Sequence, residues 1–566
     1  MRLEFSKLKR LTRSNRHELK QLPQTFSELS EGSARLYRGG YLAVISALAF
    51  GLVYLALIDS FDTIPYFFSI GIVTIFALHA WLRNGLSSIP LLPVFILQQS
   101  IIYSLPMVVQ DEAFLKTSER TLLSSSFAIC LFILALIGGW SYGKTIVKRP
   151  PPSRFVLLSS HLKRDRTRIL QVGLSLLLFG FLFNIFNRTG LLHAILPDEF
   201  IGLLAILRAG ADASTLLGAT ISGMFLALKP KDIWTWSFAL LVIANIGFSL
   251  IDFRLAAAST IIISTAAGLS LAKRRVPWVF LISAFLIFGF LNQSKFIMRD
   301  RYWEGDATWV DVPLKEIPKL YREWFSTSAK MFTGNGDSFK KSIVAKTSSV
   351  DSGQSIIERI DNLQNLIWAV DAVQEKNIPV LNGKTYLLVP KLLFPRFLWK
   401  DKPRVHEGQV LLNLHFQRQF SVKQTERTYI AWGALPEAVG NFGIVFGPAL
   451  IGLLIGIFLG LIEKISIHQR FFSIEGLLLI GFLLKMGVSH EMVASVFITS
   501  FFQFSVLIIA AGMAFRIWIG PTDAAAAYAY PSSRKKRESE SENAPLTNPA
   551  QKSTPTTRPW PPTNDG

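Results

Sequence analysis

Charged and aromatic residues are concentrated in one stretch of this chain, Gly383–Gly443. It begins GKTYLLVPKLLFPRFLWKDKPRVHEG and continues to ERTYIAW and LPEAVGNFG. Residues 384–427 hold nine Lys and Arg against three Asp and Glu, whereas residues 293–383 hold twelve of each kind. Such fixed cations suit an anionic, lipid-linked group at a membrane boundary, because Arg offers phosphate a planar two-bond fork and Lys a point charge. A solvated basic surface attracted to lipid headgroups is the alternative.

Long hydrophobic segments surround this stretch and must position it. The chain has 566 residues, of which 50% are hydrophobic and 17% charged, whereas soluble domains carry about 25% charged residues. Many windows of about 18 residues are almost free of charge, which is the length that crosses a bilayer. The sequence therefore predicts an all-α polytopic membrane protein.

Basic loops determine the predicted orientation of the spans in the membrane. Lys and Arg crowd between residues 144 and 168 and again at 273–275, and such loops stay in the cytoplasm. Twelve spans with both termini in the cytoplasm satisfy every short loop. The predicted spans are about 40–58, 64–82, 86–108, 121–143, 169–187, 213–228, 233–251, 254–272, 277–292, 435–463, 474–489 and 493–515.

The remaining segments form three further parts. Residues 1–39 are a basic cytoplasmic arm that precedes the first nine spans, in 40–292. Residues 293–432 are too long for a connecting loop and predict a mainly helical extracytoplasmic domain, with 383–432 as its active-site loop. Apolar residues at helical spacing predict a helix within 355–376. Residues 433–515 hold the last three spans, and the Pro- and Ser-rich residues 516–566 predict a disordered cytoplasmic tail.

The charge and the cysteine content exclude several classes of protein. The formal net charge is +20, which the basic cytoplasmic loops explain without a nucleic-acid partner. Cys130 is the only cysteine, so the chain forms no internal disulfide and has no cysteine cluster for a metal. No phosphate-binding loop or zinc motif is present, which leaves ATP-driven transport and zinc proteolysis unsupported.

Two motifs in the central stretch resemble a known family. The pattern G-x-T-Y, a hydrophobic run and then P-R-x-L-W-x-D-K-P resembles the outer loop of Wzy-type polysaccharide polymerases, the membrane polymerases of O-antigen and exopolysaccharide repeat units. The following E-x-x-x-N-F-G, at 437–443, resembles the start of that family's next span. The glycine-rich segment 447–460 and an Arg at the outer end of a span, Arg254, also fit.

The resemblance implies a membrane glycosyltransferase on the outer face of the bacterial cytoplasmic (inner) membrane. Its substrates would be oligosaccharides linked to undecaprenyl pyrophosphate, and its surroundings membrane lipids. The growing glycan leaves its lipid pyrophosphate and joins a sugar hydroxyl of the next unit. No cofactor, nucleotide sugar or metal would be needed, and a chain-length regulator protein is a further partner to consider.

The chemistry of that reaction assigns roles to residues. The departing pyrophosphate needs cations, for which the candidates are Arg254, Arg396, Lys402 and Arg404. The acceptor hydroxyl needs a base, for which they are His406, Glu407 and Glu437. Tyr386, Trp399 and Trp432 are candidates for stacking on sugars, and Asn441 for binding substrate. The competing structural roles are a surface histidine for His406, a helix N-terminal acid for Glu437 and interfacial aromatic residues.

Two other functions remain open. An O-antigen ligase has closely related chemistry with another acceptor. A flippase or other transporter of lipid-linked oligosaccharides has the same topology, although no repeat of two halves is evident and a transporter would keep its polar residues mainly inside the spans.

Overall fold

This computed structural model describes the structure of most of the chain between residues 25 and 519. The described residues are 25–157, 163–189, 191–192, 201–226, 233–253, 255–273, 275–303, 313–332, 361–394, 399, 401–427, 430, 432–488 and 492–519. Within them the chain is helical and has no β-strand, only two isolated bridges, Thr25–Arg470 and Val156–Ser473. The prediction of an all-α protein is confirmed.

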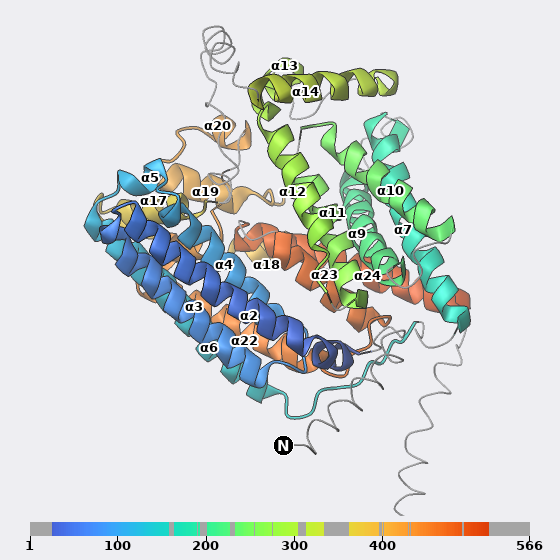
Figure 1. Cartoon of the computed structure of the whole chain (residues 1–566), viewed down its shortest axis with the longest axis horizontal. Coiled ribbons are helices and arrows are strands. Elements are labelled where there is room, and N and C mark those ends of the chain that lie inside the picture. The colour runs from blue at the N-terminus through green and yellow to red at the C-terminus, as the bar shows by residue number, and fades with distance from the viewer. Residues whose placement is uncertain are drawn as a thin grey trace, which may run out of the picture. The chain divides into compact units, whose positions relative to one another are not determined.

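The helices follow one another along the whole described chain (Figure 1). Their bounds are α2 Phe26–Leu57, η1 Phe61–Thr63, α3 Ile64–Asn84, α4 Leu91–Val108, α5 Glu112–Leu115, α6 Glu119–Ile146, α7 Lys163–Arg188, α9 Ile201–Leu226, α10 Ile233–Leu250, α11 Leu255–Lys273, α12 Trp278–Asn292, α13 Lys295–Tyr302, η3 Leu314–Glu316, α14 Ile317–Phe332, α17 Leu363–Gln374, α18 Leu388–Leu393, α19 Glu407–His415, α20 Val422–Arg427, α21 Ala434–Phe442, α22 Phe446–Ser466, α23 Ile474–Val488 and α24 Ala494–Ile519.

Eight segments within the described residues are long and apolar enough to cross a membrane. They are Phe26–Leu57, Phe61–Asn84, Leu91–Val108, Glu119–Ile146, Arg168–Arg188, Leu255–Lys273, Phe446–Ser466 and Ala494–Ile517. Each overlaps one predicted span, and two shorter apolar helices, Trp236–Leu250 and Trp278–Asn292, overlap two more. The membrane-embedded character of the chain follows from these helices, whereas the count of twelve spans and their orientation stay predictions.

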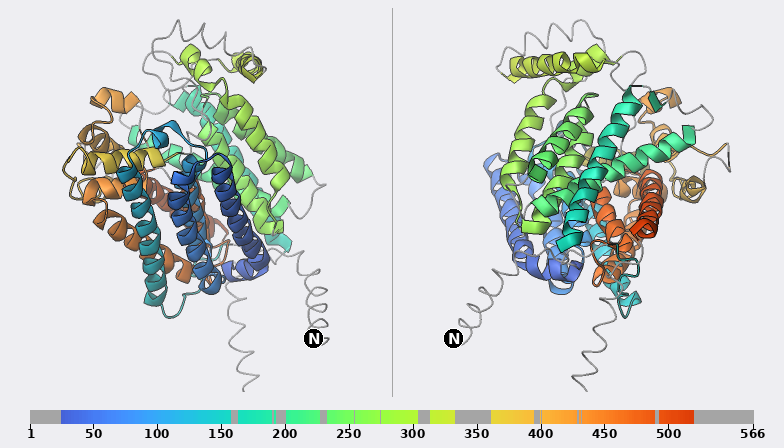
Figure 2. Two further views of the ribbon diagram at one scale, coloured as in Figure 1. Left: turned by 60° about the vertical axis from the view of Figure 1, so that its left-hand side comes forward. Right: turned by 90° about the vertical axis from the view of Figure 1, so that its right-hand side faces the viewer.

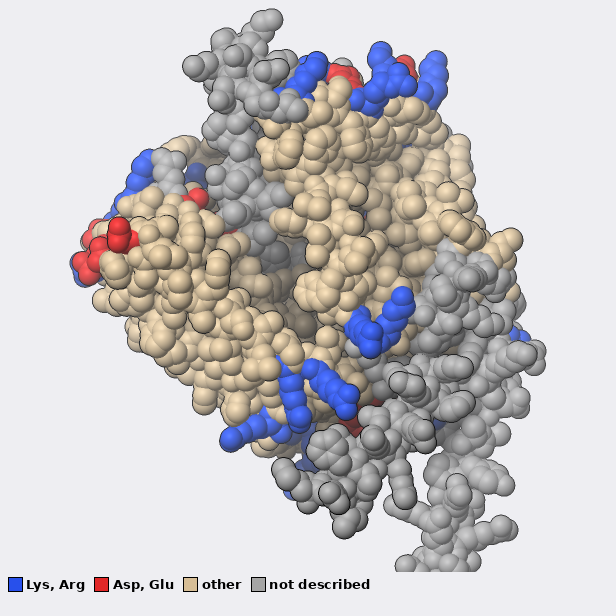
Figure 3. All heavy atoms as spheres, in the orientation of Figure 1, with Lys and Arg blue, Asp and Glu red and all other residues tan. Residues whose placement is uncertain are grey.

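Charge is distributed as such a protein requires. The space-filling view shows the charged side chains of the described residues in the upper and lower parts of this face, with a broad uncharged band between them (Figure 3). Large apolar side chains are exposed along the helices, including Phe50, Phe76, Leu240 and Val279. Exposed apolar surface on this scale marks contact with lipid rather than water.

Glycines bring α6 and α22 into backbone contact, and these helices lie side by side in Figures 1 and 2. A Cβ atom at Gly139 would lie 2.2 Å from the Leu453 oxygen, and one at Gly456 would lie 2.1 Å from the Leu136 oxygen. Neither contact leaves room for a side chain. Small residues let membrane helices approach closely enough for extensive van der Waals contact, so this pair forms a rigid support for α21, which precedes α22.

A backbone break inside the predicted tenth span produces two helices instead of one. Gly433 and Gly443 have φ angles of +80° and +82° and bound the short helix α21, because glycine adopts this conformation without strain. The prediction of one continuous span over 435–463 is therefore wrong in its first turns. The apolar helix that can cross a membrane begins at Phe446, and α21 packs against α22 and α17.

Two other segments differ from the sequence prediction in their bounds. Helix α2 begins at Phe26, so its first turns lie in the predicted basic arm, and the Thr25 hydroxyl caps it by accepting the Glu28 N–H at 3.3 Å. Helix α17 lies inside the predicted 355–376 helix, and its buried face includes Leu366 and Val370. The earlier part of that prediction lies outside the described residues.

Candidate functional site

A buried carboxylate, Glu437 in α21, is the centre of the candidate site. Its Oε1 accepts the Thr385 hydroxyl at 2.6 Å, and its Oε2 accepts the backbone N–H of Ala494 at 2.7 Å. Asn441, one helical turn further on, donates from Nδ2 to the Thr385 hydroxyl oxygen at 2.9 Å and to the Glu437 carbonyl at 2.8 Å. All three side chains are fully buried.

The turn that carries Thr385 is held against α21 by its backbone. The N–H groups of Leu381 and Asn382 donate to the carbonyls of Gly440 and Asn441 at 3.0 and 2.9 Å. Gly383 then takes a φ of +80°, beside the ring of Phe442. A glycine is required there because few L side chains adopt this conformation. The turn formed by the G-x-T-Y motif therefore points the Thr385 side chain toward Glu437 and Asn441 of α21.

The environment of Glu437 favours its neutral form. Burial raises the pKa of this carboxyl to about 7, although the Thr385 hydroxyl and the Ala494 N–H oppose the shift by stabilising the carboxylate. The Ala494 N–H belongs to the first residue of α24, where the helix dipole also favours negative charge. Helix α21 lies outside the eight segments that can cross a membrane. Glu437 therefore changes charge near neutral pH.

The start of α19 packs beside this cluster. A Cβ atom on Gly408 would lie 3.0 Å from the Ser495 hydroxyl oxygen and 3.8 Å from Thr385 Cβ. The Ser495 hydroxyl donates to the Val405 carbonyl at 3.3 Å. These contacts place the 405–408 segment against both the Thr385 turn and the first turn of α24. His406 and Glu407, two of the predicted bases, therefore flank the Glu437 cluster.

His406 and Glu407 are only partly buried, in contrast to Glu437. His406 precedes the first residue of α19, and its Nδ1 lies 2.7 Å from Oε1 of the buried Gln409. With this oxygen as acceptor, Nδ1 carries the proton and Nε2 carries the lone pair. This tautomer is the one that accepts a proton through Nε2.

The predicted cations lie in the segment that leads into α19. Lys402 is half-buried, and Arg404 and Trp399 are exposed. The backbone N–H of Lys402 donates to the Trp399 carbonyl at 3.2 Å, and that of Glu407 donates to the Arg404 carbonyl at 3.1 Å. Consecutive turns therefore connect these three residues to Glu407. Arg396 and Arg254, the other two predicted cations, lie outside the described residues.

Two predicted aromatic residues, Tyr386 and Trp432, differ in their contacts and in the burial of their rings. The Tyr386 ring stacks on Phe442, with centroids 5.7 Å apart. Its buried hydroxyl has no hydrogen-bond partner within the described structure, and burial, with Glu437 nearby, keeps its pKa well above the ordinary value. Trp432 is fully buried, and its N–H donates to Asn413 Oδ1 at 2.7 Å. The prediction that Trp432 stacks on sugars is wrong, because the ring has no exposed face.

Sequence reasoning missed two features of the structure. Thr385 belongs to a predicted motif but received no role, and its contact with a residue 52 positions later has no signal in local spacing. Glu463, near the end of α22, is also fully buried and accepts the Trp140 Nε1–H at 2.7 Å, the Leu92 N–H at 2.8 Å and the Trp81 Nε1–H at 3.2 Å. It therefore joins α3, α4, α6 and α22, far along the chain from the Thr385 turn.

The described residues include no group of three or more His, Cys, Asp or Glu side chains that could hold a metal ion. Comparisons of the chain with models of known protein families, with curated proteins and with solved structures found no match in any of the three. The function is therefore argued from the geometry of the Glu437 cluster and its surroundings.

Proposed function

We propose that this chain is a membrane glycosyltransferase that joins lipid-pyrophosphate-linked oligosaccharide repeat units into a polysaccharide. One observation carries the proposal: the motif segments that resemble the Wzy-type polymerases meet at one place. Thr385 comes from G-x-T-Y, and Glu437 and Asn441 come from E-x-x-x-N-F-G. The segment after the Asp-Lys-Pro motif packs against the same Thr385 turn through Gly408.

The reaction breaks one bond and forms another. An acceptor sugar hydroxyl attacks the anomeric carbon of the donor glycan, whose bond to the lipid pyrophosphate breaks, and the leaving group takes the electron pair. The hydroxyl proton goes to a base, for which His406 Nε2 is the candidate. Lys402 and Arg404, together with Arg396, stabilise the charge that develops on the pyrophosphate.

The geometry changes the role proposed for Glu437. Its carboxylate is fully buried, so we assign it a positioning role instead of contact with the acceptor. It fixes the Thr385 turn and the first turn of α24, and these two elements hold the 405–408 segment. Asn441 supports the same hydrogen bonds from within α21.

Deletion of the gene in its host, followed by analysis of lipid-linked glycans, tests the proposal. A polymerase predicts that single repeat units accumulate on the outer face of the membrane and that the wild-type gene restores polymer. Accumulation of single units on the inner face would favour a flippase. Lipid-linked polymer of normal length that fails to reach its final acceptor would favour a ligase.

A further inference from the structure

Helix α14, Ile317–Phe332, crosses the end of α12, and the views in Figures 1 and 2 agree on this arrangement. The two helices are in contact. The side chains of α14 and of the preceding turn η3 fall into three stripes along the helix. One stripe is buried, one is apolar and exposed, and one is cationic.

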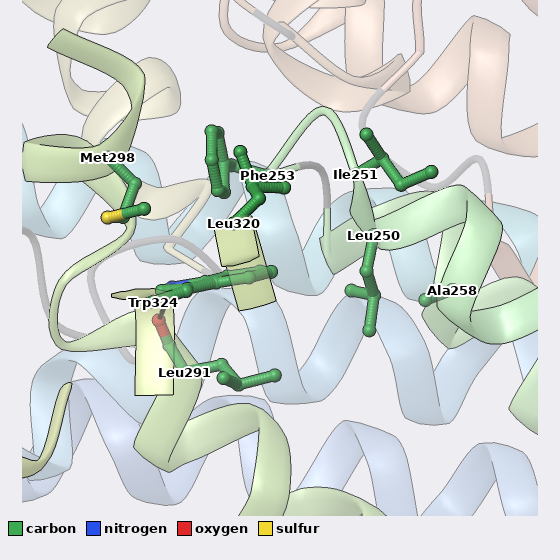
Figure 4. Close-up of a cluster of buried hydrophobic side chains, with 8 residues drawn as sticks. All are labelled: Leu250, Ile251, Phe253, Ala258, Leu291, Met298, Leu320 and Trp324. Atoms are coloured by element: carbon green, nitrogen blue, oxygen red, sulfur yellow. Dashed lines mark hydrogen bonds between the residues drawn. The ribbon is translucent and has the colours of Figure 1, made fainter. Parts of the chain in front are cut away.

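The buried stripe fixes α14 to the bundle. Trp324 is fully buried, donates its Nε1–H to the Leu291 carbonyl at 3.0 Å and packs edge-on against Phe253, with centroids 5.0 Å apart. The Ser328 and Ser294 hydroxyls lie 2.6 Å apart. Figure 4 shows Trp324 and Leu320 of α14 within the same cluster as Leu291 and Phe253. The orientation of the other two stripes is therefore fixed.

The second stripe is apolar, although it is not covered by protein within the described structure. Leu314, Phe325 and Phe332 are exposed and are spaced by eleven and seven residues, which places them on one face. Tyr321, beside them, stacks on Trp324 and donates its hydroxyl to the Gly247 carbonyl, so it packs against the buried cluster. Phe325 is 47% exposed and Phe332 is 74% exposed. The ring centroids of these two residues lie 5.8 and 6.4 Å from that of Phe290 in α12. Large apolar side chains of α12, such as Phe285 and Leu286, are exposed too, so the apolar surface continues from α12 onto α14.

The third stripe carries positive charge and borders the second. Lys315, Lys319, Arg322 and Lys330 are exposed and repeat at spacings of four, three and eight residues. Glu323 lies among them, but its carboxylate pairs with Arg301 and the Tyr302 hydroxyl. Glu316 is exposed beside the same row, but four cations outnumber it, so the outward charge of this stripe is positive.

We propose that α14 lies on the surface of the bilayer that α12 enters. Its Phe325–Phe332 stripe inserts among the acyl chains, and its Lys319–Arg322 row contacts the phosphates of anionic phospholipids. Two observations identify this occupant. The apolar stripe is continuous with the exposed apolar side of α12, and the adjoining charge complements lipid phosphate. A basic amphipathic helix binds the membrane interface in this way, and the assignment does not depend on the proposed enzyme activity.

Fluorescent labels at neighbouring positions test the proposal on the full chain. Cys130→Ser provides a cysteine-free background, and single cysteines at Phe325 and at Ser326 then carry an environment-sensitive fluorophore. Ser326 is exposed and lies on the cationic side of the same turn. Leu314→Cys, on the apolar stripe, repeats the test without removing an aromatic ring. The protein is reconstituted in nanodiscs of phosphatidylcholine with or without phosphatidylglycerol.

We expect lipids with a spin label on the acyl chain to quench the fluorophore at 325 and at 314, and aqueous iodide to quench the one at 326 several-fold more strongly than either. Lys319→Glu combined with Arg322→Glu should reduce lipid quenching at 314 in the discs that contain phosphatidylglycerol. Equal iodide quenching at 314, 325 and 326 would overturn the proposal. So would protection of 314 and 325 from iodide without quenching by lipid, which would indicate a protein partner instead.

Discussion

The Thr385 hydroxyl connects the Thr385 turn to α21, because it donates to Glu437 and accepts from Asn441. Removal of one partner from a buried network leaves the others unsatisfied. Two substitutions separate the role of the Thr385 hydroxyl from the role of the side-chain volume. Val retains the shape of Thr without the hydroxyl, and Ser retains the hydroxyl in a smaller side chain.

We predict that Thr385→Val lowers the rate of polymer formation roughly tenfold to a hundredfold, the cost of a hydrogen bond to a charged group. Thr385→Ser should retain most of the activity. Polymer length on a gel, with abundance in the membrane measured by immunoblot, checks both. Equal activity of the Val and Ser variants at equal abundance would show that activity does not depend on the Thr385 hydroxyl.

The ionisation of Glu437 predicts a pH dependence. Its pKa is raised to about 7, so the carboxylate that accepts the Thr385 and Ala494 hydrogens is lost as pH falls through 7. Activity should fall over the same range. In Glu437→Gln, activity should be low, and its decline as pH falls through 7 should be shallower than in the wild type. An unchanged pH profile in this variant would contradict the positioning role.

The same shift predicts how stability depends on pH. The folded protein holds a proton on Glu437 more tightly than the unfolded chain does, so the contribution of this group to the free energy of unfolding decreases as pH rises from 4.5 to about 7. Glu437→Gln should therefore show a smaller loss of thermal stability over this range than the wild type. Thermal unfolding in detergent at several pH values measures the difference.

The sequence predicted part of this site because its motifs carry the residue types that the chemistry needs. The segment that carries His406 and Glu407 packs beside the Thr385 turn, and Thr385 donates to Glu437, whereas the catalytic roles of these residues stay predictions. The burial of Glu437 could not be predicted, because it depends on Ala494, 57 residues later, at the start of another helix. Trp432 was misassigned for a related reason: its burial results from tertiary packing with α19 and its neighbours.

Helix periodicity and composition identified most elements, whereas the breaks between them depended on single glycines. The 435–463 segment is apolar enough to read as one helix, but positive φ angles at Gly433 and Gly443 separate α21 from what precedes and follows it. Both glycines were visible in the sequence. Their conformations were not, because a glycine inside a membrane helix can instead allow close packing, as Gly456 does.

Adjacent glycines in α6 provide a test of that close packing. A Cβ at Gly139 would lie 2.2 Å from the Leu453 carbonyl oxygen, whereas a Cβ at Gly138 would meet nothing within 4 Å. Gly139→Ala should therefore lower the thermal unfolding midpoint in detergent, because α6 and α22 must separate. Gly138→Ala is the matched control and should leave the midpoint unchanged or raise it, since Ala favours helix. A lower midpoint in both variants to the same extent would contradict the role assigned to the α6–α22 contact.

At the scale of the whole molecule, hydropathy predicted the membrane-embedded helices, because continuous apolar runs have few alternatives to a bilayer. Orientation relies on the distribution of Lys and Arg among the loops. The predicted orientation would put the candidate site on the outer face, where the proposed reaction would meet its lipid-linked substrates.

Cysteine labelling in intact cells tests this orientation. In the Cys130→Ser background, Lys423→Cys in α20 should react with a membrane-impermeant reagent from outside. Lys148→Cys, after α6, should react only once the membrane is permeabilised. Both positions are exposed on the protein, so access depends on the side of the membrane. The reverse pattern would place the candidate site in the cytoplasm and exclude the proposed reaction.

Reconstitution of the purified chain with lipid-pyrophosphate-linked repeat units, in excess chelator, tests the proposed polymerase activity directly. We predict a ladder of polymer with release of lipid pyrophosphate from the wild type. Glu437→Gln and Thr385→Val should give little polymer, and Thr385→Ser should give a near-normal ladder. Absence of polymer from folded wild type, or a normal ladder from Glu437→Gln, would contradict the account.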